Sequence, residues 1–86
     1  MSWNVYILRC SDNSLYTGIT TDVERRISEH NDKSSNLGAK FTRGRQPVKL
    51  VFQEQAETRS QASKREMEIK SLTRIQKLNL IESVIK

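Results

Sequence analysis

WNVYILRCSDNSLYTGIT, residues 3–20, contains two runs rich in aromatic and β-branched residues, at residues 3–8 and 15–20. Such runs favour β-strands. Residues 11–14 between them, Ser-Asp-Asn-Ser, have the composition of a tight turn. We therefore expect an antiparallel hairpin at the start of the chain.

Side chains alternate between the two faces of a strand, and this alternation assigns the hairpin residues to faces. Tyr6 is expected on one face, with Val5 and Ile7 on the other. In the second strand Tyr16 shares a face with Gly18. Because both faces carry apolar groups, we expect other elements to cover both.

Three later segments begin with a capping-box pattern, Thr followed three residues later by Glu or Gln, at residues 21–24, 58–61 and 73–76. We expect helices at about residues 22–31, from residue 58 and from residue 73. Their apolar stripes are Val23, Ile27 and His30 in the first, Ala62, Ile69 and Leu72 in the second, and Ile75, Leu78, Ile81 and Ile85 in the third.

Residues 33–46 lack periodicity and are expected to form a long basic loop, with Lys33 among its cations. After Pro47, a third strand is expected at residues 48–52, where Val48, Leu50 and Phe52 alternate. The chain is thus expected to form a single α/β (α+β) domain over residues 1–86. Its three-stranded antiparallel sheet would be flanked by helices in the order β-β-α-β-α-α.

The bulk composition narrows the class of partner. Fifteen Lys and Arg residues against ten Asp and Glu give a net charge of +5, which favours acidic partners such as nucleic acid but also suits plain solubility. The single cysteine, Cys10, cannot form an internal disulfide or a cysteine-cluster metal site. With neither a signal segment nor a long apolar run, we expect a cytoplasmic protein without membrane contact.

Two charged residues lie on apolar helical stripes, where an unpaired charge is costly to bury. Arg26 falls between Val23 and Ile27, and Glu66 is aligned with Ala62. One interpretation is an ion pair between Arg26 and Glu66. The other is a shared cleft in which the arginine binds phosphate and the carboxylate binds Mg²⁺. Arg25 and Glu29, spaced i, i+4, are expected to form a solvated pair without chemistry.

The tyrosines and the histidine also allow two interpretations. Tyr6 and Tyr16 are either half-buried strand aromatics or phenols facing the same cleft, where one can act as a general base. His30, the only histidine, is more often a packing residue than a ligand. Gly18 is expected to permit a close backbone approach whatever the function.

Cations and an aromatic residue in the basic loop suggest a nucleic-acid contact, with a charged solvated loop as the alternative. A second group on the following helix extends this surface toward Glu66. The candidate nucleic-acid-binding residues are Lys40, Phe41, Arg43, Arg45, Lys64, Arg65 and Lys70.

Taken in order, these residues resemble the GIY-YIG nuclease family, and most closely its small stand-alone bacterial members. The resemblance rests on Asn4-Val5-Tyr6 and Tyr16-Thr17-Gly18, then on residues 21–26 with His30, and finally on residues 62–66. It covers nearly the whole chain, including the stretch Phe41-Thr42-Arg43. The ordered set is far more specific than either triplet alone.

The resemblance implies roles for five residues. Glu66 would hold one divalent metal, Mg²⁺ or Mn²⁺, and Arg26 would bind the scissile phosphate. Tyr6 and Tyr16 would position or deprotonate the attacking water, with His30 auxiliary. The sequence departs from the family pattern at Asn4, which replaces a glycine, and at Ile19, where repair-type members often carry lysine.

The expected function is therefore metal-dependent, endonuclease-like hydrolysis of phosphodiesters in DNA, in repair or processing. The alternative is a nucleic-acid-binding or adaptor module with little or no catalysis, and a protein-interacting scaffold is a third possibility. The sequence leaves the natural substrate and any partner protein open.

Overall fold

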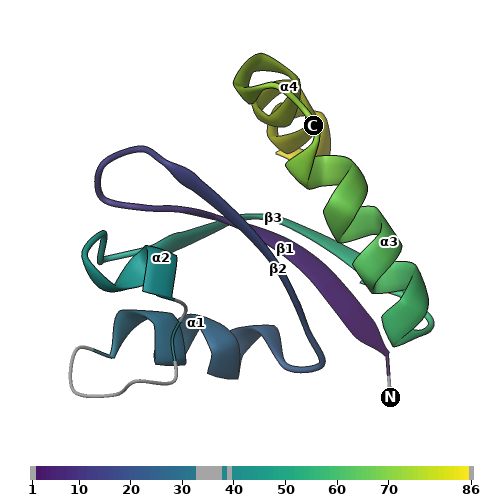
Figure 1. Cartoon of the computed structure of the whole chain (residues 1–86), viewed down its shortest axis with the longest axis horizontal. Coiled ribbons are helices and arrows are strands. Elements are labelled where there is room, and N and C mark those ends of the chain that lie inside the picture. The colour runs from purple at the N-terminus through teal and green to yellow at the C-terminus, as the bar shows by residue number, and fades with distance from the viewer. Residues whose placement is uncertain (1, 33–37, 39, 86) are drawn as a thin grey trace.

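The structure, a computed structural model, describes residues 2–32, 38 and 40–85. Its elements follow the expected order with one additional short helix (Figure 1). They are β1 (Trp3–Arg9), β2 (Leu15–Thr20), α1 (Val23–Asn31), α2 (Lys40–Arg43), β3 (Lys49–Ala56), α3 (Arg59–Lys70) and α4 (Arg74–Ile85). None of the helices in these ranges is long and apolar enough to cross a bilayer.

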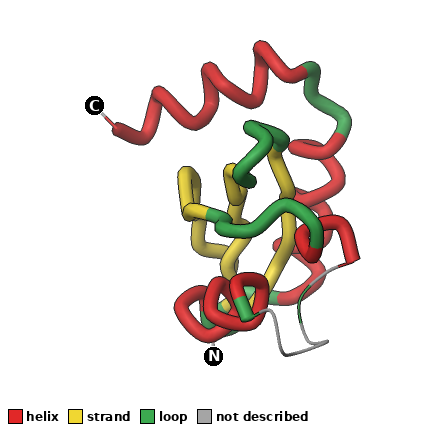
Figure 2. Tube along the Cα trace, turned by 90° about the vertical axis from the view of Figure 1, so that its left-hand side faces the viewer, coloured by secondary structure: helices red, strands yellow, loops and turns green. Residues whose placement is uncertain are grey.

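A three-stranded antiparallel sheet of order β2-β1-β3 confirms the expected fold, and β1 lies at its centre. Val5 and Ile7 point to the face that packs against Ile69 of α3. Tyr6 and Leu8 belong to a separate buried cluster on the side of α1. Figures 1 and 2 show α4 and α1 on opposite sides of the sheet. Both faces are therefore covered, and each buried aliphatic side chain contributes about 1.5–3 kcal/mol.

The turn between β1 and β2 depends on two residues. The Asp12 carboxylate accepts a hydrogen bond from the backbone N–H of Ser14 at 3.0 Å. Asn13 has φ 67°, in the left-handed region that asparagine tolerates better than most residues. These local interactions close the hairpin that the sequence predicts.

The cap of α1 differs from the expected one. Asp22, not Thr21, is the N-cap, and its carboxylate accepts a hydrogen bond from the N–H of Arg25 at 3.1 Å. A charged acceptor at a helix N-terminus also interacts favourably with the helix dipole, which favours aspartate over its threonine neighbour.

The two later caps use the predicted threonines. Thr58 accepts from the N–H of Gln61 at 3.1 Å, while the Gln61 side chain accepts from Glu57 instead of from Thr58 itself. Thr73 and Gln76 form the complete reciprocal box, at 3.2 and 2.9 Å. These contacts set the start of α3 and of α4.

The third strand is longer than expected and its pattern is different. β3 covers residues 49–56, and its pairing with β1 shifts register between Ile7 and Leu8. The alternation expected of Val48, Leu50 and Phe52 therefore does not place the three side chains on one face. Val48 packs with Leu8, Phe52 packs with Ile7, and Leu50 is exposed. A bulge inserts one extra residue, and side chains beyond it change faces.

Part of the predicted loop is helical. Residues 40–43 form α2, and Thr42 in it is fully buried with its hydroxyl 2.9 Å from His30 Nδ1. A four-residue helix is too short to show periodicity, so only this tertiary contact reveals why it forms. Lys33 lies outside the described residues.

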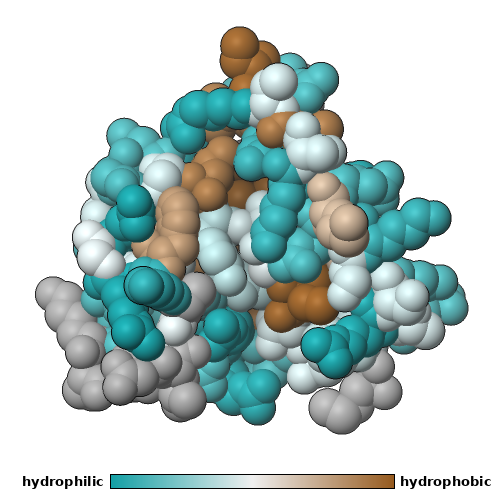
Figure 3. Space-filling model, in the orientation of Figure 1, coloured by the Kyte–Doolittle hydropathy of each residue, from teal (hydrophilic) through white to brown (hydrophobic). Residues whose placement is uncertain are grey.

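The apolar stripe of α4 is only partly buried. Ile81 is buried and Leu78 packs at the edge of the same cluster, but Ile75 is 72% exposed, contrary to the expected stripe. Ile85 lies outside the residues whose side chains are described. Figure 3 shows a mainly hydrophilic face with hydrophobic side chains at the α4 end.

Candidate active site

Tyr6 and Tyr16 lie on neighbouring strands, with ring centroids 6.4 Å apart. The cross-strand partner of Tyr6 is Gly18 on the edge strand β2. A Cβ atom at Gly18 would lie 2.5 Å from the Tyr6 hydroxyl oxygen and 3.2 Å from a Tyr16 ring carbon. The missing side chain thus leaves room for the buried Tyr6 ring and its hydroxyl beside β2.

His30 connects Tyr6 to α2 through hydrogen bonds at both ring nitrogens. Its Nε2 is 3.0 Å from the Tyr6 hydroxyl, and its Nδ1 is 2.9 Å from the Thr42 hydroxyl. Burial, followed by the nearby charge of Arg26, lowers the pKa of His30 to about 4. The imidazole is therefore neutral at pH 7, with one nitrogen donating and the other accepting.

The Tyr6 hydroxyl is protonated in this environment. Burial raises the pKa of Tyr6 to about 12, and the adjacent Tyr16 acts in the same direction. A hydrogen bond from Arg26 lowers this pKa but does not outweigh burial. Tyr6 can therefore donate or relay a proton at neutral pH, whereas a standing phenolate is disfavoured.

Arg26 is held by a neighbour on its own helix. Its Nη1 lies 2.9 Å from Glu29 Oε1, while the expected contact between Arg25 and Glu29 is longer, at 3.9 Å. Glu29 is thus not confined to a solvated pair with Arg25, as the spacing alone suggested. It fixes the Arg26 guanidinium beside the Tyr6 hydroxyl.

Glu66 lies on α3, which packs against β1 and β2. Its ion pair is with Lys70, at 3.4 Å, instead of the alternative partner Arg26. Its side chain is 21% exposed, and its negative charge contributes to raising the pKa of Tyr6. Because α3 packs against β1 and β2, the Glu66 carboxylate lies within electrostatic range of the Tyr6 hydroxyl.

The predicted loop surface is partly used for internal contacts. Arg45 is 3.1 Å from Asp12 and lies 4.2 Å above the Phe41 ring. Phe41 in turn contacts Tyr16, with ring centroids 5.8 Å apart. One face of the Phe41 ring, which was expected to stack on a base, is therefore covered by Arg45, and the Phe41 ring packs against Tyr16.

The remaining predicted binding residues differ in how their charge is balanced. Arg65 pairs with Glu54 at 2.9 Å, and Lys70 pairs with Glu66. Lys64 is exposed and forms no ion pair within the described residues. Lys40 and Arg43 are exposed at the ends of α2.

Comparison with known proteins settles the family. The model of the GIY-YIG catalytic domain matches residues 2–79. The chain belongs to the GIY-YIG family.

Similar GIY-YIG relatives include a UPF0213 protein from Haloquadratum walsbyi, 62% identical over 78 residues, which span 91% of this chain and 84% of the relative. Another from Desulfotalea psychrophila is 52% identical over 82 residues, or 95% of this chain and 73% of the relative. A solution NMR structure of a UPF0213 protein from Bacillus halodurans aligns with a TM-score of 0.60 at 46% identity, covering 95% and 84% of the two chains. A protein from E. faecalis aligns with a TM-score of 0.64 at 40% identity, covering 100% and 90%.

GIY-YIG nucleases are generally dependent on a divalent metal. Within residues 2–32, 38 and 40–85, no three His, Cys, Asp or Glu side chains gather into a metal cluster. Zinc, which needs three or four protein ligands, is a poor match. Glu66 alone suits Mg²⁺ or Mn²⁺, because such hard cations keep most of their waters and take substrate phosphates as further ligands.

Three residues that support the candidate site were not predicted to do so from the sequence. Thr42 appeared only within the stretch Phe41-Thr42-Arg43, with no role, and Glu29 was assigned to a solvated pair. Asp12 was a turn residue, although it also holds Arg45. Thr42 and Asp12 make contacts with residues distant in sequence, and Glu29 can pair with either of two arginines on its own helix. Neither situation produces a pattern that can be recognised in the local sequence.

Proposed function

We propose that this protein hydrolyses phosphodiester bonds of DNA in a reaction that depends on a divalent metal. One observation carries the proposal: His30 Nε2 lies 3.0 Å from the Tyr6 hydroxyl, and the charges of Arg26 and Glu66, from two helices, both influence the pKa of that hydroxyl. Tyr16 lines the same place. A cation, a carboxylate and two phenols are the groups that bind and polarise a phosphodiester and its attacking water.

Arg26 binds the scissile phosphate in this proposal. Guanidinium groups bind phosphate oxygens through two parallel hydrogen bonds, and Glu29 orients the fork from one side. The Arg26 side chain is 25% exposed, so a substrate can reach it. Arginine at this place also stabilises the negative charge that develops on the phosphoryl oxygens.

Tyr6 and His30 move the proton. Because the pKa of Tyr6 is about 12, its hydroxyl takes a proton from water only as its own proton leaves. His30 Nε2, at 3.0 Å, is the acceptor for that proton when the Nδ1 hydrogen faces Thr42. Tyr16 packs against the His30 ring, with centroids 5.2 Å apart, and keeps this geometry in place.

Glu66 would hold the metal ion, either Mg²⁺ or Mn²⁺. When bound, the ion supplies Lewis-acid stabilisation and makes a bound water more acidic. Lys70 competes for the same carboxylate in the ion pair at 3.4 Å. We place the activity in DNA repair or processing in the cytoplasm.

The test incubates the protein with labelled single-stranded, duplex and branched DNA, with Mg²⁺ or Mn²⁺ or with a chelator. We expect cleavage only with metal, and a loss of at least about 100-fold in Glu66→Gln. Glu68→Gln is the matched control, because Glu68 is an exposed carboxylate of the same helix without an ion pair in the described part of the chain. Equal cleavage by the two variants would contradict the proposal.

A second candidate is a DNA-binding module without catalysis. It is favoured by the ion pair that occupies Glu66 and by the high pKa of Tyr6. DNA binding without metal-dependent cleavage would support this module, and no DNA binding at low salt would favour a protein-interacting scaffold.

A further inference from the structure

The positive charge of the protein is unevenly balanced. Five cations that lie around the candidate site or along α3 each have an acidic partner within 4 Å, namely Arg25, Arg26, Arg45, Arg65 and Lys70. In the part of the chain that the structure describes, Arg9 and Lys49 have no acidic partner, and neither does Lys64 on α3. Part of the net positive charge of +5 therefore lies on residues away from Tyr6 and Tyr16.

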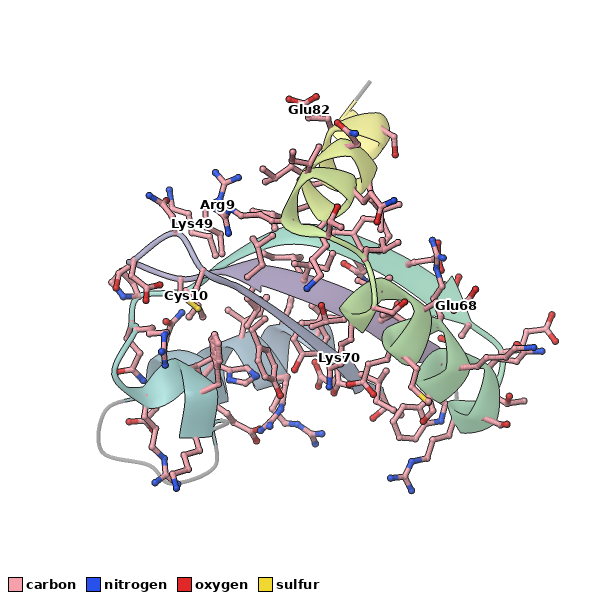
Figure 4. The ribbon with its side chains drawn as sticks, turned by 45° about the horizontal axis from the view of Figure 1, so that its top comes forward. Arg9, Cys10, Lys49, Glu68, Lys70 and Glu82 are labelled. Carbon is pink, nitrogen blue, oxygen red and sulfur yellow. The ribbon has the colours of Figure 1, made fainter. Side chains whose placement is uncertain are left out.

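Arg9 and Lys49 lie directly opposite each other at the end of the β1–β3 pair. Both are exposed, and Figure 4 shows them side by side, pointing away from the sheet on the side where α4 lies. Two like charges facing each other across strands destabilise a sheet. An anion bound between them would offset that cost.

The first turn of α4 adds cations to the same end of the sheet. Arg74 donates a hydrogen bond to the backbone carbonyl of Asn13 at 2.7 Å, which holds α4 beside the β1–β2 turn. Lys77 follows one helical turn later, in line with Arg74 and with the buried Ile81. Glu82 lies further along the same helix, toward its C-terminal end (Figure 4).

We propose that these four residues, Arg9, Lys49, Arg74 and Lys77, form a second DNA-binding surface, which we call the basic end. Its ligand is the sugar-phosphate backbone of double-stranded DNA, because the surface offers cations from three elements and its exposed strand pair carries no aromatic stacking group. The choice of DNA rests on the proposed function.

The basic end faces away from the Tyr6 hydroxyl. Arg9 lies on the face of β1 that carries Ile7, whereas Tyr6 lies on the opposite face. A DNA molecule bound at both places would contact the protein on two sides of the sheet. The basic end would then add affinity without sequence preference, since phosphate contacts carry no base information.

The experiment measures binding of a short labelled DNA duplex in chelator, by fluorescence anisotropy, at several salt concentrations. Each cation that neutralises a phosphate adds about 0.9 to the slope of log affinity against log salt. For Arg9→Gln/Lys49→Gln we expect roughly tenfold weaker binding at low salt and a slope smaller by about two. Arg9→Lys/Lys49→Arg keeps both charges and should bind as the unmodified protein does.

A single change elsewhere provides the charge control. Arg59→Gln removes one cation from the first turn of α3, and it should weaken binding less than Arg9→Gln or Lys49→Gln. An unchanged affinity and slope in the double variant, with its fold verified by circular dichroism, would overturn the basic end. A failure of the nuclease proposal would be distinguishable from this result. In that case the protein would not cleave DNA in the presence of metal, but DNA binding in chelator would still be measured.

Discussion

At residue 18 any side chain would occupy the space that the Tyr6 hydroxyl takes. The cross-strand pair Tyr6 and Gly18 brings the phenol over the edge strand β2. This glycine is not needed for a left-handed backbone, because no described glycine has a positive φ. Its contribution is the absence of a Cβ.

Gly18→Ala tests this packing directly. The added Cβ would lie 2.5 Å from the Tyr6 oxygen, so the phenol or the strand must shift. We expect a loss of about 1–3 kcal/mol in unfolding free energy and a strong loss of cleavage. Gly44→Ala is the control, since nothing lies within 4 Å of its added Cβ. Similar urea midpoints for the two variants would contradict the packing argument.

Tyr6→Phe removes the hydroxyl and keeps the ring. We expect cleavage to fall by about 100-fold or more, as for the loss of a general acid-base group. Unfolding free energy should drop by about 1–3 kcal/mol, because His30 Nε2 loses its buried partner. DNA affinity measured in chelator should not change. Cleavage at the original rate would exclude the proposed proton path through Tyr6.

Among the helices and strands, those that are determined by local sequence patterns were predicted correctly from the sequence. The hairpin, the capping threonines of α3 and α4 and the antiparallel sheet follow from turn chemistry, caps and alternation. The bulge that separates Val48 from Phe52 and the four-residue helix α2 were missed. Both depend on tertiary contacts, which no period in the sequence encodes.

The candidate site shows the same division. Four candidate residues were proposed from the sequence, namely Tyr6, Tyr16, Arg26 and Glu66. Arg26 and Glu66 interrupt apolar helical stripes, and all four occur in the order that the GIY-YIG family shows. Their partners were not predicted: Glu29 was placed with Arg25, and the structure pairs it more closely with Arg26. A helical residue can reach either i−3 or i−4, and spacing does not choose between them.

Thr42→Val tests α2 as the element that orients His30. Valine keeps the volume but removes the oxygen bonded to Nδ1, so the buried ring loses a partner. We expect a loss of about 1–3 kcal/mol, with Thr42→Ser near the unmodified protein. Nitrogen NMR shifts of the His30 ring report the tautomer, which should change only in the valine variant. An unchanged tautomer in that variant would mean that α2 serves packing alone.

For the whole molecule, the central strand separates two kinds of surface. One face of β1 carries Tyr6 into a buried polar network, and the other carries Val5 and Ile7 into the main apolar core. Among described residues, every buried side-chain nitrogen and oxygen has a hydrogen-bond partner. Stability should therefore be sensitive to pH wherever a network member titrates.

His30 gives that dependence a definite sign. Its pKa is about 4 when folded against 6.5 for a free histidine, chiefly because of burial. Between these values the unfolded chain binds more protons than the folded one, so acid favours unfolding. Stability is fully present above about pH 6.5 and falls as the pH drops toward 4, by on the order of 3 kcal/mol.

Urea unfolding at several pH values, compared between the unmodified protein and His30→Gln, isolates this contribution. The His30→Gln variant should be less stable than the unmodified protein at pH 7. Its free energy of unfolding should change little between pH 6.5 and 4. Asp12, whose pKa is lowered by its hydrogen bonds to Ser14, loses its contribution only as the pH falls below about 3.8 and does not overlap this range. Parallel stability curves for the two proteins from pH 7 to 4 would show that His30 is not the group that makes the fold acid-sensitive.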